Sequence, residues 1–159
     1  MEQSKKCLLP VRHGIHLSKS MGPKSPKEIR QMSVIPYASA IGSLMYAMIC
    51  TRPDIAYAVN ITSRYQSNPG SEHWAAVKTV LKYLRRTKDM FLVYGRVTEL
   101  RVEAYTDADF QSDVDDRSSN SRYVFTLNGE DVSWKSKKQD VIVDFTKEAE
   151  YVTAAEAGK

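Results

Sequence analysis

Apolar and polar side chains alternate along residues 100–106, a period of two that is typical of a β-strand with one buried face. Two further strands are predicted at residues 122–127 and 131–136, because both runs contain β-branched and aromatic residues. The Asn128-Gly129 pair between them favours a tight hairpin turn. This part of the chain is therefore predicted to form an antiparallel sheet.

Upstream of the strands, apolar residues recur at the helical spacing of three and four. A first helix is predicted from Pro36 to about Cys50. A second is predicted to be capped by Thr51 and to hold Pro53 in its first turn, and a third to be capped by Ser71. The third helix has an apolar stripe that we expect to lie in the core, formed by Trp74, Val77, Leu81 and Leu84.

Two shorter apolar runs complete the pattern. Residues 90–94 are predicted as a short strand, and residues 141–145 form a run that Asp144 interrupts. A closing helix is predicted to start at Asp144 or Thr146, and we interpret Asp144 as its cap. The order of small helices, a strand meander and one closing helix predicts an α+β fold.

Composition and charge divide the chain further. Of 159 residues, 42% are hydrophobic and 26% are charged, which is ordinary for a globular protein of one medium or two small domains. Residues 1–30 are basic and contain prolines, so we interpret them as an extended or partly disordered leader, either a solvated tail or an arm along phosphates. Residues 31–96 form the predicted helical region, and residues 97–159 the predicted sheet with its closing helix. His13 and His16 in the leader lack a third metal ligand nearby, so no metal site is assigned there.

The compartment is predicted from what the chain lacks. No apolar run approaches the ~20 residues of a membrane span, and the start lacks the apolar core of a secretory signal. Cys7 and Cys50 lie far apart and in no metal-binding spacing, which indicates free thiols in a reducing compartment. We therefore expect an intracellular protein, cytoplasmic or nuclear, without a membrane partner. Its net charge of +4 is compatible with nucleic-acid binding.

Acidic residues gather just after the first predicted strand. Five of the ten residues from Asp107 to Asp116 are acidic. The residues alone leave two interpretations open. One is a solvated loop, in which neighbouring charges repel by only ~1 kcal/mol in water. The other is a stretch in which one or more carboxylates hold a divalent cation. Further acids, Glu148 and Glu150, begin the closing helix, and a strand-end acid with a helix-borne acid is half of a two-metal phosphodiester site.

Several motifs occur in a specific order. The second half contains YTDADF at 105–110, DDRS at 115–118, YVF at 123–125, SWKSKKQ at 133–139 and EAEY at 148–151. In these segments it resembles the ribonuclease H region of copia-type retrotransposon Pol polyproteins. The first half contains GSLMY at 42–46, TRPDI at 51–55 and EHW at 72–74. It resembles the thumb or connection region that ends the reverse transcriptase of the same polyprotein. The resemblance covers nearly the whole chain.

The resemblance implies a site chemistry. In ribonuclease H folds four carboxylates hold two magnesium ions, or manganese in their place, which activate water and stabilise the leaving 3′ oxygen of the RNA strand. Position by position, the catalytic and metal-binding candidates are Asp107 and Glu150, whereas Asp109 and Glu148 are neighbours that we do not assign. The other two acids would follow Lys159. We therefore expect a truncated ribonuclease H-like sheet that holds a cation weakly and lacks activity alone.

The third predicted helix carries basic residues away from its apolar stripe: Lys78, Lys82, Arg85 and Arg86. They form either a solvated face or, as the resemblance implies, a surface that follows the phosphates of an RNA–DNA hybrid or duplex. Some positions depart from the family pattern. Arg122 stands where the family usually has glycine, Phe110 replaces a common tryptophan, and residues 143–147 replace a small, serine-rich approach to the helix.

Three functional hypotheses follow. The first is a retrotransposon-derived Pol fragment, catalytically incomplete, that binds nucleic acid weakly. The second is a domesticated module that contacts a protein partner, or a second copy of itself, through the open edge of the truncated sheet. The third is a nuclease completed by a partner that supplies the missing acids.

Overall fold

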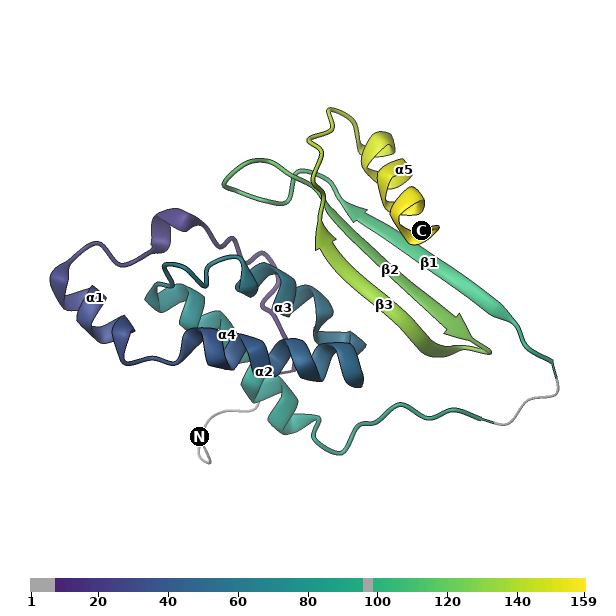
Figure 1. Ribbon diagram of the computed structural model, residues 1–159, viewed down its shortest axis with the longest axis horizontal. Coiled ribbons are helices and arrows are strands. Elements are labelled where there is room, and N and C mark those ends of the chain that lie inside the picture. Colours follow the sequence, from purple (N-terminus) through teal and green to yellow (C-terminus); the bar gives the residue numbers. More distant parts are fainter. Residues whose placement is uncertain (1–7, 96–98) are drawn as a thin grey trace. The chain divides into compact units, whose positions relative to one another are not determined.

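The computed structural model describes residues 8–95 and 99–159 (Figure 1). The chain divides into two compact units, Met1–Met90 and Phe91–Lys159. The first is helical, and the second is an antiparallel sheet with one helix, so the predicted α+β class is confirmed. The start of the predicted leader, Cys7, and the predicted boundary between residues 96 and 97 lie outside the described residues.

The first unit consists of short and medium helices in the part that the structure describes. They are η1 (Lys19–Met21), α1 (Pro26–Ser33), α2 (Tyr37–Cys50), η2 (Pro53–Ile55), α3 (Ala56–Ser63) and α4 (Ser71–Arg86). The predicted helix at 36–50 is confirmed as α2. The second predicted helix begins as the 3-10 turn η2 with Pro53 as its first residue and continues as α3.

The core of the first unit lies between α2, α3 and α4. Ile41 and Leu44 of α2, Val59 of α3 and Val77 of α4 are at most 2% exposed. Trp74, Leu81 and Leu84 pack against this cluster, so the predicted apolar stripe of α4 is confirmed. Full burial of a side chain of this size stabilises the fold by about 1.5–3 kcal/mol.

Two predicted helix caps are wrong. Thr51 ends α2, because its N–H donates to the Ala47 carbonyl at 3.1 Å, and η2 begins without a side-chain cap. Ser71 is the first residue of α4, and Gly70 holds the cap position. The Gly70 N–H donates to Nδ1 of His73 at 2.8 Å. The side chain that accepts a backbone N–H at the start of α4 is therefore His73, and not Ser71 as predicted.

His73 also attaches the segment before α1 to α4. Its side chain is 0% exposed, and its Nε2 lies 3.0 Å from the Ser18 carbonyl. Because a carbonyl only accepts, Nε2–H donates there and Nδ1 accepts from Gly70, so the buried ring is neutral. Tyr65 stacks on this ring with centroids 4.0 Å apart and donates from its hydroxyl to the Leu17 carbonyl at 2.8 Å.

The prediction that residues 1–30 form an extended leader is wrong for the last of these residues. Pro26 is the first residue of α1, a position where its missing N–H costs nothing. Ser25 and Glu28 form a capping box: Ser25 Oγ accepts the Glu28 N–H at 3.2 Å, and Glu28 Oε2 accepts the Ser25 N–H at 3.1 Å. A proline that was expected to break helices therefore starts one.

The second unit contains β1 (Val102–Asp109), β2 (Asn120–Leu127), β3 (Glu130–Lys138) and α5 (Thr146–Ala157). The strands form an antiparallel sheet in the order β1-β2-β3, and α5 packs on β1 and β2. Asn128 and Gly129 have φ of 54° and 84° in the turn between β2 and β3, which confirms the predicted hairpin. β1 extends to Asp109, so it includes acids that were predicted to lie beyond its end.

The predicted strand at residues 90–94 is wrong. This segment has no β-ladder, and side-chain hydrogen bonds hold its end instead. The Tyr94 hydroxyl donates to the Asp131 carbonyl at 2.9 Å, and the Gly95 N–H donates to Glu130 Oε1 at 2.8 Å. Apolar composition alone predicted a strand here, but a strand also needs a partner.

The predicted cap of the closing helix is also wrong. Phe145 holds the cap position of α5 and makes no side-chain cap hydrogen bond. The Asp144 N–H donates to Glu148 Oε2 at 3.2 Å, so the acid in the first turn of the helix accepts from the residue that was predicted to cap it.

The close approach at Gly70 gives a stability prediction. A Cβ at Gly70 would lie 1.8 Å from the Met21 carbonyl oxygen, so Gly70→Ala is expected to destabilise the first unit by about 1–3 kcal/mol. Gly42→Ala in α2 is the matched control, since a Cβ there meets nothing within 4 Å and alanine favours a helix. Urea unfolding followed by circular dichroism measures both variants. An unchanged midpoint for Gly70→Ala would contradict the packing described here.

Candidate functional site

The acidic stretch lies at the end of β1 and in the loop that follows. Asp107 and Asp109 are two residues apart on a strand, so their side chains share one face of the sheet. Arg122 lies opposite Asp107 in β2. Its Nη2 is 2.6 Å from Asp107 Oδ2 and 2.9 Å from Asp109 Oδ1. One guanidinium therefore pairs with both carboxylates of the strand.

Asp107 and Glu150 belong to opposite sides of the sheet. Ser121, the neighbour of Arg122 in β2, faces α5, because its Oγ lies 2.9 Å from Oγ1 of Thr153. Successive side chains of a strand point to opposite faces, so Arg122 and its partner Asp107 face away from α5. Glu150 is exposed on α5. Asp107 lies on β1 and Glu150 on α5, as the motifs predicted. The two carboxylates nevertheless lie on opposite sides of the sheet.

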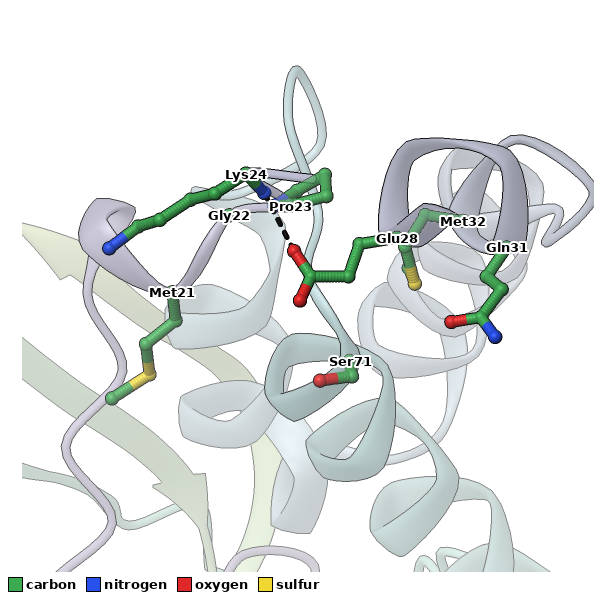
Figure 2. Close-up of a pocket in the computed structure, with 8 residues that line it drawn as sticks. All are labelled: Met21, Gly22, Pro23, Lys24, Glu28, Gln31, Met32 and Ser71. Atoms are coloured by element: carbon green, nitrogen blue, oxygen red, sulfur yellow. Dashed lines mark hydrogen bonds between the residues drawn. The ribbon is translucent and has the colours of Figure 1, made fainter. Parts of the chain in front are cut away.

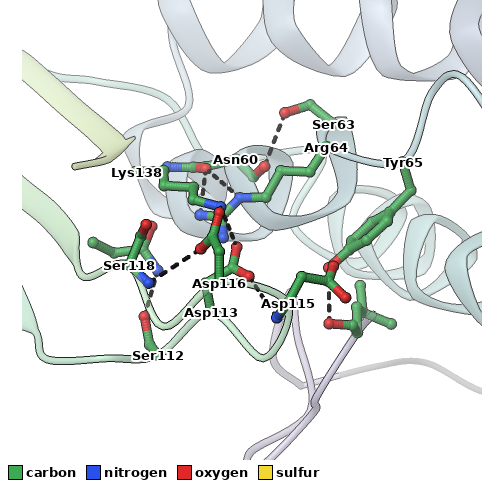
Figure 3. Close-up of polar contacts among 12 residues, drawn as sticks. Asn60, Ser63, Arg64, Tyr65, Ser112, Asp113, Asp115, Asp116, Ser118 and Lys138 are labelled. Carbon is green, nitrogen blue, oxygen red and sulfur yellow. Dashed lines mark hydrogen bonds and ion pairs between the residues drawn. The ribbon is translucent and has the colours of Figure 1, made fainter. Parts of the chain in front are cut away.

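Lys138 of β3 holds two further acids of the loop (Figure 3). Its Nζ lies 2.9 Å from Asp113 Oδ2 and 2.5 Å from Asp116 Oδ2. The other oxygen of each carboxylate accepts a backbone N–H, from Asp115 to Asp113 at 2.9 Å and from Ser118 to Asp116 at 3.1 Å. The Asp113 side chain is only 3% exposed. The loop is therefore folded around a buried ion pair.

These contacts shift the pKa values of Asp116 and Lys138. The hydrogen bond from Lys138 lowers the pKa of Asp116 from 3.8 to about 2. Burial alone would lower the pKa of Lys138, but its hydrogen bonds to Asp116 and Asp113 outweigh burial and raise it. Asp116 and Lys138 are therefore both charged at neutral pH.

Basic side chains of the sheet pair with most acids of this stretch. Asp107, Asp109, Asp113 and Asp116 are compensated by two basic side chains of the same sheet, Arg122 and Lys138. Among residues 8–95 and 99–159, no group of three or more His, Cys, Asp or Glu is placed to hold a metal ion. The weakly held Mg²⁺ or Mn²⁺ stays a prediction.

A buried polar network attaches α5 to the sheet, and sequence reasoning missed it. Gln139 is 2% exposed, and its Nε2 donates to the Ala149 carbonyl at 2.9 Å and to Ser121 Oγ at 3.0 Å. Thr153 Oγ1 lies 3.2 Å from the same Nε2. Gln139 ends the SWKSKKQ motif, but a polar residue after lysines gives no sign of burial.

The predicted basic residues lie on one face of α4. Their spacing places them on the side opposite the buried residues His73, Ala76, Val77 and Val80. Lys78, Arg85 and Arg86 are exposed, and Lys82 is half-buried. The face runs to the last residue of the helix, Arg86.

Arg52 has a structural role that the sequence did not predict. It is 9% exposed, and its Nε and Nη2 donate to the two carboxylate oxygens of Asp54 at 2.9 and 2.7 Å. Its Nη1 donates to the Thr87 carbonyl at 3.2 Å, which attaches η2 to the end of α4. Burial raises the pKa of Asp54, but hydrogen bonds from Arg52 and Tyr83 outweigh burial and lower it. The TRPDI motif thus supplies a packing contact.

A pocket lies beside α1 and the start of α4 (Figure 2). Its lining includes Met21, Lys24, Glu28, Gln31, Met32 and Ser71. Glu28 is the lining carboxylate, and it already accepts the N–H groups of Lys24 and Ser25 at 2.8 and 3.1 Å. The hydrogen bond from Lys24 is the largest cause that lowers the pKa of Glu28. The lining carboxylate is therefore already part of the capping box of α1.

In the part of the chain that the structure describes, no single helix has the length and apolarity to cross a membrane. α1 and α2 reach that length only as a pair, with a bend of 47° between them.

Comparison with known proteins relates the whole chain to transposon proteins. It is 47% identical over 159 residues to the retrovirus-related Pol polyprotein from transposon TNT 1-94 of Nicotiana tabacum, matching 100% of this chain and 12% of that protein. It is 42% identical over 119 residues to the retrovirus-related Pol polyprotein from transposon RE2 of Arabidopsis thaliana, matching 75% of this chain and 8% of that protein. The chain thus spans a small part of these polyproteins.

A shorter relative matches over most of its own length. The chain is 44% identical over 126 residues to secreted RxLR effector protein 161 of Plasmopara viticola, which covers 79% of this chain and 89% of that protein. No family model matches the chain, and no solved structure matches it.

The Lys138 ion pairs give a pH prediction. Lys138→Gln is expected to return the pKa of Asp116 from about 2 toward 3.8. In the unaltered chain the folded-state pKa is the lower one, so this carboxylate stabilises the fold fully above pH 3.8 and loses that contribution as the pH falls toward 2. The variant loses this dependence. It is also expected to lose about 1–3 kcal/mol of stability at pH 7, since it removes the charged hydrogen bond from Lys138 to the buried Asp113 carboxylate.

Carboxyl NMR titration and urea unfolding measure the two effects. Lys135→Gln is the matched control, since Lys135 is exposed on the same strand. An Asp116 that titrates near 3.8 in the unaltered chain would contradict the ion pair.

Proposed function

We propose that this chain, which is similar to the retrovirus-related Pol polyproteins of copia-type transposons over most of its length, is a ribonuclease H-like Pol segment that binds RNA–DNA hybrids without cleaving them. Residues 31–96 are assigned to the end of the reverse transcriptase and residues 97–159 to the front of the ribonuclease H-like domain. The order of β1, the β2–β3 hairpin and α5 supports this assignment, since Asp107 lies on β1 and Glu150 on α5.

One observation carries the absence of cleavage. Two-metal hydrolysis needs carboxylates that converge on the same ions. Here the Asp107 carboxylate pairs with Arg122 at 2.6 Å on the face away from α5, and α5 carries Glu150. This arrangement supports the proposal that the two acids assigned to catalysis by the resemblance do not share a metal.

The basic face of α4 supports hybrid binding. Lys78, Lys82, Arg85 and Arg86 recur at three and four residues, so they present a row of positive charge along one side of a rigid helix. A row of this kind matches the phosphates of a nucleic-acid backbone and carries no base specificity. Binding is therefore expected to be weak, independent of sequence and sensitive to salt.

The sheet edge supports a second candidate function. In the described residues, β1 pairs only with β2, so its outer edge is open. Val102 and Tyr105 on this strand are 66% and 59% exposed. An open strand with apolar side chains is a template for another strand, from a protein partner or a second copy of this chain. A dimer that forms with rising concentration in sedimentation experiments, together with no affinity for hybrid, would favour this function.

The absence of cleavage is tested directly. The purified chain is expected to leave a labelled RNA–DNA hybrid intact with Mg²⁺ or Mn²⁺, because its two candidate acids do not converge. Asp107→Asn is the control that separates activity of this chain from a contaminating nuclease. Cleavage that Asp107→Asn abolishes would contradict the proposal. Cleavage that needs an added partner protein would favour a nuclease completed in trans.

Hybrid binding is tested by charge removal. The triple variant Lys78→Gln, Lys82→Gln, Arg86→Gln is expected to bind hybrid more weakly at low salt. Three lost phosphate contacts should also reduce the slope of log affinity against log salt by about 2–3. Fluorescence anisotropy at several salt concentrations measures both. The charge-matched control replaces Lys27, Lys135 and Lys147, which are exposed on other elements. Equal losses in the two triple variants would contradict a role for α4.

A further inference from the structure

We propose that Arg122 is the resident counter-ion of the Asp107–Asp109 pair and that it keeps divalent metal ions off this face of the sheet. This inference deepens the proposed function, on which it rests for the assignment of Asp107 as the first-strand acid. Arg122 is the residue that prevents metal binding at Asp107, and a single substitution of Arg122 should restore that binding.

The geometry of the sheet positions Arg122 against Asp107 and Asp109. Arg122 lies opposite Asp107 in the β1–β2 register, and directly opposed side chains of an antiparallel pair share a face. Asp109 lies on that same face two residues along β1. The single Nη2 atom lies 2.6 and 2.9 Å from the two carboxylates, so it occupies the space where both could reach one cation. The backbone register of two strands thus holds the guanidinium in place.

The chemistry explains why a metal ion does not simply displace this group. The planar guanidinium of arginine carries a positive charge and presents several N–H donors that match carboxylate oxygens. Mg²⁺ demands near-octahedral oxygen ligands and gives up its water reluctantly. A metal ion at this position would meet two carboxylates already engaged and a positive charge close by. The Arg122 side chain is 32% exposed, so water screens this repulsion only in part.

A second pair in the same sheet follows the same rule. Lys138 lies opposite Asn120, two residues before Arg122 on β2, so Lys138 and Arg122 share one face. Lys138 pairs with Asp113 and Asp116 as Arg122 pairs with the strand acids. The two adjacent strands therefore present one basic side chain each to the acidic stretch. Charge compensation from within the sheet is a repeated feature here.

The experiment is Mn²⁺ binding, followed by electron paramagnetic resonance, on the full chain. The unaltered chain is expected to show no Mn²⁺ bound at Asp107. Arg122→Gln is expected to gain at least about tenfold in Mn²⁺ affinity, a change of about 1.4 kcal/mol. The double variant Arg122→Gln, Asp107→Asn is expected to lose that gain. Arg101→Gln is the matched control, because Arg101 also pairs with an acid of β1, Glu103, but is 79% exposed.

Several outcomes would overturn the proposal. One is Mn²⁺ binding by the unaltered chain that Asp107→Asn removes. Another is a folded Arg122→Gln variant without a gain in affinity, with folding checked by circular dichroism. If that variant does not fold, paramagnetic broadening in the unaltered chain decides. Broadening of the Asp107 and Asp109 carboxyl signals by Mn²⁺ would refute the exclusion, and signals that stay sharp would support it.

These outcomes are separate from those that test the proposed function. If the chain binds no hybrid, or if the α4 variant binds it as well as the unaltered chain, the expected Mn²⁺ affinities do not change. Mn²⁺ bound at Asp107 without any cleavage would refute the counter-ion role and leave the non-cleaving assignment standing.

Discussion

Compensation of the acidic stretch is the interaction on which the second unit depends. Four carboxylates between Asp107 and Asp116 lie close together, and one of them, Asp113, is almost fully buried. A buried carboxylate without a partner would destabilise the fold by several kcal/mol. Lys138 pairs with Asp113 and Asp116, and Arg122 pairs with Asp107 and Asp109, so these contacts link β1 and the loop to β2 and β3. The strand register thus brings acids and bases of different elements into contact.

The first unit uses buried polar side chains in a similar way. Arg52 connects η2 to the end of α4 through its contacts with Asp54 and Thr87. His73 connects the start of α4 to the segment before α1 through Gly70 and Ser18. Both residues lie in motifs that carry the family resemblance. Their contacts are nevertheless internal, which indicates that these motifs preserve packing in the helical unit.

Sequence pattern predicted the elements well where local signals decide them. The stripe of α4, the helix α2 and the hairpin at Asn128-Gly129 depend on periodicity or turn conformation, which a short window contains. The caps at Thr51 and Ser71 and the strand at residues 90–94 were wrong, because distant groups decide them. Gly70 is held by His73 and lies against Met21, and residues 90–94 form no β-ladder with another strand. The α1 helix was missed because Pro26 was interpreted as a breaker, although Ser25 and Glu28 form a capping box.

The candidate site shows the same limit in its chemistry. Motif position identified Asp107 and Glu150 as carboxylates on the right kinds of element, but a motif does not contain the partner of a side chain. The partner of Asp107 is set by the β1–β2 register, which is a property of the folded sheet. The face of the sheet that each acid occupies follows from the same register. An arginine opposite Asp107 engages this carboxylate in an ion pair while every residue of the YTDADF motif stays in place. In this chain, the residue opposite the motif is therefore as informative about chemistry as the motif itself.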